Sequence, residues 1–303
     1  MTVTGRKKDN SNSIGISLAL LAVLIWSGNF IVAKDVNKEI LPVSLNFYRW
    51  LTASVILFPF AIKKIITEWD LIKRSWHYLF WAALSGVALF NTFVYVGAHY
   101  TSAINLALIG TTSSPIMAIV FARFFLGEKI GWMKLAGMLL CITGILFLLS
   151  KGDFRNLASM SFGKGDLWML AAAFCFAVYN TLVKKKPATL SHISFLFTIF
   201  TLGTLMVLPF FIGELKNSTA VSWNGRLIFS VLFLGLGASV ICFLIWNIAI
   251  GKLGAGRTVL FGNLIPVFSS LEAVLMLHEK ISSVHVISFI LVVTGLIIAN
   301  LKK

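Results

Sequence analysis

The sequence contains few charged residues, and acidic residues are especially scarce. Of its 303 residues, 12% are charged, 11 are Asp or Glu, and 58% are hydrophobic. Soluble domains carry about 25% charged residues, so this composition excludes a water-soluble globular protein. A chain this apolar needs lipid as its solvent, and no stretch remains that is long enough for a separate soluble domain.

Cysteine is also scarce, and the residues that build metal sites do not cluster. Cys141, Cys175 and Cys242 lie inside apolar runs without CxxC spacing, which predicts small core residues and no disulfide framework. The five histidines form no HExxH pair, and the carboxylates do not cluster. The sequence therefore predicts no catalytic residue, no metal site and no cofactor, which argues against a membrane-embedded enzyme as the alternative class.

The net charge of +15 does not come from a continuous basic face, because Lys and Arg stand in short clusters between apolar runs. This pattern argues against nucleic-acid binding and indicates membrane topology. With the N-terminus placed inside, seventeen cations fall on the cytoplasmic side and eight on the other, with Arg49 left within a span. We therefore predict a multi-pass protein of the bacterial inner membrane with both termini in the cytoplasm.

About 20 apolar residues cross a bilayer as a helix, and such runs recur from residue 14 to the end of the chain. The first run lacks a small-residue cleavage site, so it is expected to stay as a helix and not to be removed as a signal peptide. The fold class predicted is an all-α membrane protein with ten transmembrane helices. Their predicted ranges are 14–33, 44–62, 77–98, 102–126, 130–150, 165–183, 191–213, 226–250, 257–277 and 281–301.

Sliding the chain against itself by 151 residues reveals an internal repeat, because Leu126-Gly127-Glu128-Lys129-Ile130 then aligns with Leu277-His278-Glu279-Lys280-Ile281. Each half holds five spans, an odd number, so the second half must enter the membrane from the opposite side and the repeat is inverted. Inverted repeats are typical of secondary transporters, whose substrate site lies near the bilayer midplane. The predicted organisation is a cytoplasmic tail at 1–13, a first five-helix repeat at 14–150, an external linker at 151–164 and a second five-helix repeat at 165–303.

Several short motifs resemble one known family. They include Trp26-Ser27-Gly28-Asn29-Phe30, Phe47-Tyr48-Arg49, Ser114-Pro115 and Leu126-Gly127-Glu128-Lys129. Together they resemble the EamA-type members of the drug/metabolite transporter superfamily, although His278 stands where the family usually shows Gly. The resemblance covers essentially the whole chain and implies transport, usually export of amino acids, other metabolites or drugs. More distant relatives carry nucleotide-sugars or sugar-phosphates, so the motifs say little about the substrate.

Polar and aromatic residues within the spans are candidates for a substrate site between the halves. Asn29 and Asn180 occupy equivalent positions, and an amide in hydrocarbon needs a partner from the substrate or from another helix. A packing role is the alternative for each candidate. The candidates are Trp26, Asn29, Asn91, Tyr95, Tyr179, Asn180, Trp246, Asn247 and Asn263.

Pro115 and Pro266 are also equivalent under the repeat and lie near the middle of spans four and nine. A proline frees the carbonyl four residues earlier in a helix. We therefore predict helix breaks beside a cavity, with a simple packing kink as the alternative.

Arg49 and Glu272 are the candidates for gating or coupling, because a charge inside a span costs at least ~2.5 kcal/mol and usually finds a partner or water. Both lie about five residues inside the external ends of their spans, or roughly 7 Å deep. One hypothesis is an Arg49–Glu272 ion pair that opens and closes, with Glu272 as a proton site. The alternative is that each side chain extends separately to the outer interface.

Two further motifs have structural interpretations. Glu128-Lys129 and Glu279-Lys280 occupy equivalent turns, where a carboxylate caps the next helix or pairs locally. Small residues recur on the last helix of each half, including Gly137, Gly144 and Gly295, and this spacing permits close helix packing. The stripe predicts either an internal brace or the contact of a homodimer.

The predicted function is a secondary transporter that exports a small neutral or zwitterionic metabolite, amino-acid-like or drug-like, by alternating access, with proton coupling left open. Its predicted partners are the small-molecule substrate and the lipid bilayer. A membrane-embedded enzyme and a carrier of a phosphorylated metabolite or nucleotide-sugar are the alternatives. The phosphorylated class would need several deep cations, whereas Arg49 is the only cation well inside a predicted span.

Overall fold

The computed structural model describes residues 3–36, 39–100, 103–158, 163–216, 221–269, 272 and 282–301. Within these ranges the ordered elements are helices, as the composition predicts. The first half contains α1 (Val3–Val36), α2 (Pro42–Thr67), α3 (Trp69–Arg74), α4 (Trp76–Ala83), η1 (Leu84–Leu89), α5 (Phe90–Tyr100), α6 (Ala103–Leu126), α7 (Trp132–Leu149) and α8 (Arg155–Ala158). The second half contains α9 (Lys164–Lys184), α10 (His192–Lys216), α11 (Gly225–Leu232), η2 (Phe233–Ile241), α12 (Cys242–Leu253), α13 (Ala255–Thr258), η3 (Val259–Leu264) and α15 (Ser283–Asn300).

Eight helical segments in the described ranges are long and apolar enough to cross a membrane. Helix α6 adds a shorter apolar stretch at Ser113–Leu126. The predicted span 257–277 ends outside the described residues, and the Glu279-Lys280 turn lies wholly outside them. The fold class is therefore an all-helical membrane protein, while the count of ten spans stays a prediction. The short helices α3 and α8 were not predicted.

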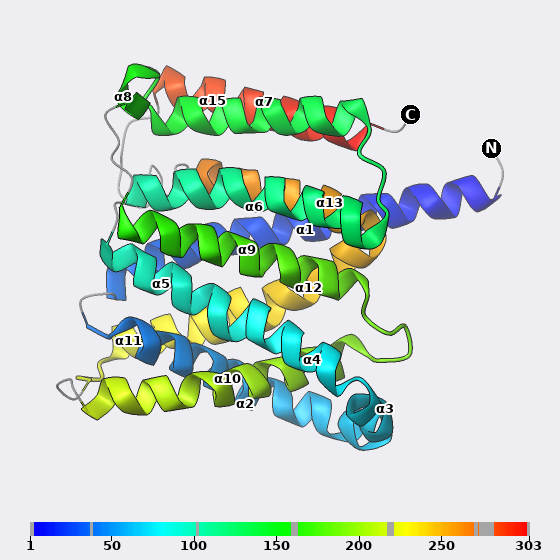
Figure 1. Cartoon of the computed structure of the whole chain (residues 1–303), viewed down its shortest axis with the longest axis vertical. Coiled ribbons are helices and arrows are strands. Elements are labelled where there is room, and N and C mark those ends of the chain that lie inside the picture. Colours follow the sequence, from blue (N-terminus) through cyan, green and yellow to red (C-terminus); the bar gives the residue numbers. More distant parts are fainter. Residues whose placement is uncertain are drawn as a thin grey trace.

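The two halves pair with inverted symmetry. In Figure 1, α7 and α15 lie side by side and run in opposite directions, since α7 ends beside α8 whereas α15 ends at the C-terminus. Helices α2 and α10 form a second pair of equivalent helices, α1 packs on α12, and α9 packs on α5. The N- and C-termini lie at the same end of the bundle (Figure 1). Each of these helices thus meets the partner that exchanging the two repeats would give it.

Glycines bring α7 and α15 into very close contact. A Cβ atom added at Gly137 would lie 2.4 Å from the carbonyl oxygen of Gly295, and one added at Gly295 would lie 2.6 Å from the carbonyl oxygen of Gly137. No side chain fits at either position without separating the helices. The stripe of small residues is therefore used as an internal brace.

Acidic side chains fix both ends of the α2–α10 pair. Glu214 near the end of α10 accepts hydrogen bonds from the Ser44 N–H at 2.6 Å and the Ser44 hydroxyl at 2.7 Å, in the first turn of α2. Glu68, just after α2, accepts from the N–H and hydroxyl of Ser191, which precedes α10, both at 3.1 Å. Each carboxylate supplies acceptors to open N–H groups at the start of the partner helix.

The two equivalent prolines have different surroundings. Helix α6 continues through Pro115, so the break predicted there is not found. A helix that crosses lipid must satisfy its backbone groups within the protein, which favours an unbroken helix. Helix α6 also packs extensively against α9. Pro266 instead follows the 3-10 helix η3, so the backbone is distorted before it.

Candidate functional site

Arg49 lies at the centre of a buried polar cluster and is 1% exposed. Its Nη1 donates to Asn29 Oδ1 at 3.1 Å, Asn91 Oδ1 at 3.2 Å and Tyr95 Oη at 2.9 Å. Its Nε donates to Ser239 Oγ at 2.7 Å. Three of the predicted substrate-site residues thus surround the residue that was predicted for gating.

A π-helical turn in each half lies at this level of the bundle. Residues 84–89 and 233–241 form the π-helices η1 and η2, at positions that the 151-residue offset makes nearly equivalent. The wider turn of η2 presents the Ala238 carbonyl to Arg49 Nη2 at 3.1 Å and to Trp26 Nε1 at 2.8 Å. Such π-bulges occur frequently at functional sites because they redirect backbone groups.

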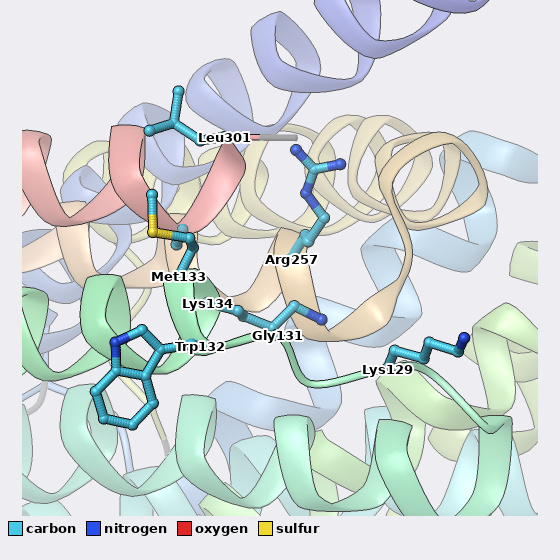
Figure 2. Close-up of a pocket in the computed structure, with 8 residues that line it drawn as sticks. Lys129, Gly131, Trp132, Met133, Lys134, Arg257 and Leu301 are labelled. Atoms are coloured by element: carbon cyan, nitrogen blue, oxygen red, sulfur yellow. The ribbon is translucent and has the colours of Figure 1, made fainter. Parts of the chain in front are cut away.

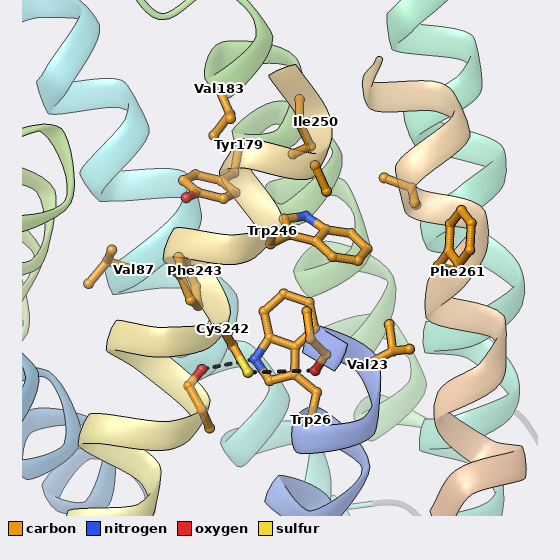
Figure 3. Close-up of a cluster of buried hydrophobic side chains, with 14 of the residues drawn as sticks. Val23, Trp26, Val87, Tyr179, Val183, Cys242, Phe243, Trp246, Ile250 and Phe261 are labelled. Atoms are coloured by element: carbon orange, nitrogen blue, oxygen red, sulfur yellow. Dashed lines mark hydrogen bonds between the residues drawn. The ribbon is translucent and has the colours of Figure 1, made fainter. Parts of the chain in front are cut away.

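The second half has its own polar cluster, which lacks a charge. Trp246 Nε1 on α12 donates to Asn180 Oδ1 on α9 at 2.8 Å, and the Tyr179 hydroxyl donates to Asn247 Oδ1 at 2.9 Å. The side chains of Trp26 and Trp246 join the clusters, because their ring centroids are 5.0 Å apart (Figure 3). Asn29 and Asn180 therefore bond within their own halves and not to each other.

Glu272 and Arg49 do not form the predicted ion pair in this structure. Glu272 Oε1 accepts from the Ser27 hydroxyl at 2.6 Å, whereas the acceptors of Arg49 are neutral oxygens. Counting residues from the ends of the spans placed both side chains at the same depth in the membrane. It could not predict which neighbouring helix each side chain faces. Glu272 Oε2 is buried without a hydrogen-bond partner among the described residues.

All nine predicted substrate-site residues are buried, at 9% exposure or less. Asn263 lies apart from the other eight, in η3 beside the Cys141 thiol of α7. The two clusters are therefore shielded from water by the helices around them.

Sequence reasoning missed three groups of the site. Ser239 bonds to Arg49, Ser27 bonds to Glu272, and the Ala238 carbonyl accepts from Trp26. The available signal was the run Gly235-Leu236-Gly237-Ala238-Ser239 in the middle of a span. Small residues there permit the close approach of α2, since a Cβ atom at Gly235 would lie 2.6 Å from Thr52 Cγ2.

A bundle of two inverted helical repeats with a buried polar cluster between them has the organisation of a secondary transporter. Sequence comparison agrees: the chain belongs to the EamA-like transporter family, whose profile matches residues 13–150 and again 163–301. The family and the relatives below carry the names of transporters and not of enzymes.

Individual relatives span nearly the whole chain. An "Uncharacterized transporter" of Archaeoglobus fulgidus is 30% identical over 94% of this chain and 97% of its own length. A "Probable amino-acid metabolite efflux pump" of Escherichia coli is 24% identical over 93% of each chain. One solved crystal structure superimposes with a TM-score of 0.76 over 96% of both chains at 18% identity, which shows a shared fold.

Proposed function

We propose that this transporter exports a small amino-acid-like metabolite by alternating access and that Arg49 binds the carboxylate of the substrate. The observation that carries the proposal is a fully buried guanidinium whose hydrogen-bond partners are all neutral. No carboxylate of the described residues lies within ion-pair distance of it. A buried charge without a counter-charge is costly, and an anionic substrate group would supply the missing charge.

The geometry of Arg49 supports exchange of its partners. Nη1 has two hydrogens but three neutral acceptors, Asn29, Asn91 and Tyr95, so one acceptor can leave without orphaning a donor. A carboxylate forms shorter and stronger bonds to guanidinium than amide or hydroxyl oxygens do. An entering carboxylate would therefore replace a weaker acceptor.

Aromatic rings beside Arg49 suit the opposite end of an amino acid. Trp26 shares the Ala238 carbonyl with Arg49 and packs against Trp246 and Phe243. An ammonium group is attracted to the face of an indole ring, so one substrate could use both features. The relative named as an amino-acid metabolite efflux pump supports this substrate class.

A phosphorylated substrate is less well supported. Arg49 and Lys134 are the buried cations of the described residues, and Lys134, at the start of α7, pairs with Glu128 at 3.5 Å. A dianionic phosphate would be expected to need more than one central cation.

Glu272 is the proposed proton site. One of its oxygens accepts a hydrogen bond from the Ser27 hydroxyl of α1, and the other is buried without a hydrogen-bond partner among the described residues. Protonation would remove a charge from the boundary between the halves, and that change couples proton binding to their rearrangement. The positive-inside bias supports an inner-membrane location with both termini in the cytoplasm.

Transport into proteoliposomes tests the proposal. Substrate counterflow is measured for a panel of amino acids, and for each one the rate is compared with that of the amine that lacks its carboxylate. We expect exchange of at least one amino acid and none of its amine. Arg49→Gln should lower kcat/KM by about tenfold to a hundredfold, the usual worth of a hydrogen bond to a charged group. Arg123→Gln, an exposed cation on α6, is the control with the same charge change.

Three outcomes would count against the proposal. Equal exchange of the amine and the amino acid would remove the carboxylate role of Arg49. Chemical conversion of the substrate in the vesicles would favour the enzyme class. A pH-gradient dependence that survives Glu272→Gln would remove the proton site.

A further inference from the structure

A second basic site lies far from Arg49, at the end of the bundle that carries the C-terminus. A cavity of about 200 Å³ opens between the start of α7, the short helix α13 and the end of α15 (Figure 2). Its walls therefore come from both halves of the chain. The residues that line it are Lys129, Gly131, Trp132, Met133, Lys134, Arg257, Ala299 and Leu301.

Three of the lining residues are cations, and one carboxylate lies beside them. Lys134 Nζ is 3.5 Å from Glu128 Oε2, and the other oxygen of Glu128 accepts from the Ala255 N–H at 3.1 Å. Arg257 is held in place by Asn300, through bonds of 3.1 Å to its Oδ1 and 2.7 Å to its carbonyl. Three cations against one carboxylate leave the cavity positively charged, and two of the cations, Lys134 and Arg257, are held in position.

The first turn of α7 adds uncapped donors to this wall. Gly131 precedes this 18-residue helix and offers no side-chain cap, and the first residues of the helix, Trp132, Met133 and Lys134, line the cavity. Helix N-termini favour anions. The lining is thus suited to an anion with several oxygens.

Apolar side chains continue from the cavity along the outer surface of the bundle. Trp132 and Leu139 lie seven residues apart on α7 and are 73% and 54% exposed. Ile297 in the last turn of α15 and Leu301 directly after the helix are 58% and 52% exposed. In a membrane protein these exposed faces meet acyl chains, and a tryptophan at a helix end is typical of the lipid–water interface.

We propose that this cavity binds the phosphate of an anionic phospholipid, with the acyl chains along Trp132 and Leu139. Phosphate is the shared chemistry of a lipid headgroup and of a soluble anion, and the apolar faces beside the cavity favour the lipid. Basic pockets between transmembrane helices bind anionic headgroups in this way. A phosphate here bridges Lys129 and Lys134 of the first half to Arg257 of the second, so it stabilises the arrangement in which these elements meet.

Lipid binding to the full chain in detergent tests this proposal by native mass spectrometry and thermal unfolding. Phosphatidylglycerol, phosphatidylcholine and inorganic phosphate are titrated separately. The parent chain should bind phosphatidylglycerol more tightly than phosphatidylcholine and gain thermal stability from it. Lys129→Gln/Arg257→Gln should weaken phosphatidylglycerol binding about 30-fold, since each cation near an anionic lipid contributes about fivefold.

Matched variants separate the site from general charge and from folding. Lys63→Gln/Lys64→Gln removes two exposed cations at the end of α2 and should leave the affinity within about twofold. Lys129→Gln alone keeps the Arg257–Asn300 bonds and should still weaken binding about fivefold. Equal affinity for the two lipids, or equal losses in the cavity and control variants, would overturn the proposal. Stabilisation by inorganic phosphate without any added effect of phosphatidylglycerol would overturn the lipid as its source.

Discussion

The two halves of the transporter share an architecture but differ in charge at one equivalent position. Within this helix pair the repeat offset shortens to 150 residues, as Pro59 and Pro209 show, so Arg49 of α2 corresponds to the apolar Ile199 of α10, next to Phe200. In the first half Arg49 joins Asn29 to Tyr95, whereas in the second half the equivalent Asn180 and Trp246 bond directly. The duplicated helices therefore give the bundle its symmetry, and a single cation makes the two polar clusters chemically different.

Giving the first half an apolar residue at this position, as the second half has, is the strongest way to break this contrast. Arg49→Phe removes the cation and leaves Asn29, Asn91 and Ser239 without their donor. We expect amino-acid counterflow to fall at least ~100-fold, because an anion-binding charge is lost and buried polar groups are left unpaired. The purified variant should also unfold at lower temperature than the parent chain.

Phe200→Leu is the matched control, since Phe200 is fully buried against Trp50 and Phe243. It should cost roughly 1–2 kcal/mol of stability through lost packing while counterflow stays within about threefold of the parent. Similar transport losses in the two variants would show that packing, and not charge, separates the halves.

The two equivalent asparagines sharpen the comparison. Asn29→Ala removes a bond to a charged group, which is worth about 1.5–3 kcal/mol, whereas Asn180→Ala removes one to a neutral indole, worth about 0.5–1.5 kcal/mol. We expect kcat/KM for counterflow to fall more in Asn29→Ala than in Asn180→Ala. Equal losses of kcat/KM in the two variants would show that the bond from Asn29 to the charged Arg49 matters no more for transport than the neutral Asn180–Trp246 bond.

The equivalent glycines of the two π-helices, Gly86 and Gly237, differ in the space around them. A Cβ atom at Gly86 would lie 2.1 Å from the Tyr179 ring, whereas at Gly237 the nearest atom, on Phe233, is 3.5 Å away. Gly86→Ala should therefore destabilise the protein by about 1–3 kcal/mol through overpacking, and Gly237→Ala should be nearly neutral. Thermal unfolding of the two variants in one detergent measures this difference, and equal midpoints would contradict it.

The sequence predicted the helices and the repeat well, because lipid demands long apolar runs and the Pro, Asn and Gly matches survive in register. It also selected Asn29, Asn91 and Tyr95, which the structure places around Arg49, while their role in binding a substrate stays a prediction. The π-helices could not be foreseen, since a span that is apolar on all sides has no periodicity to disturb. The Arg49–Glu272 pair is not formed in this conformation, and its opening and closing stay a prediction, because residue counting fixes depth and leaves the facing direction open.

The smallest predicted effect concerns the two ends of the α2–α10 pair. Glu214 accepts three hydrogen bonds from Val43 and Ser44, including two of 2.7 Å or less, whereas Glu68 accepts two of 3.1 Å from Ser191. A carboxylate at a helix N-terminus contributes about 0.3–1 kcal/mol, so Glu214→Gln should lower stability by about 1 kcal/mol and Glu68→Gln by less. Because the two sites lie at opposite ends of the helices, the double variant should show the sum of both losses in thermal unfolding. A loss well beyond that sum would mean that each carboxylate depends on the other through the α2–α10 contact, and the two ends would then act as one unit.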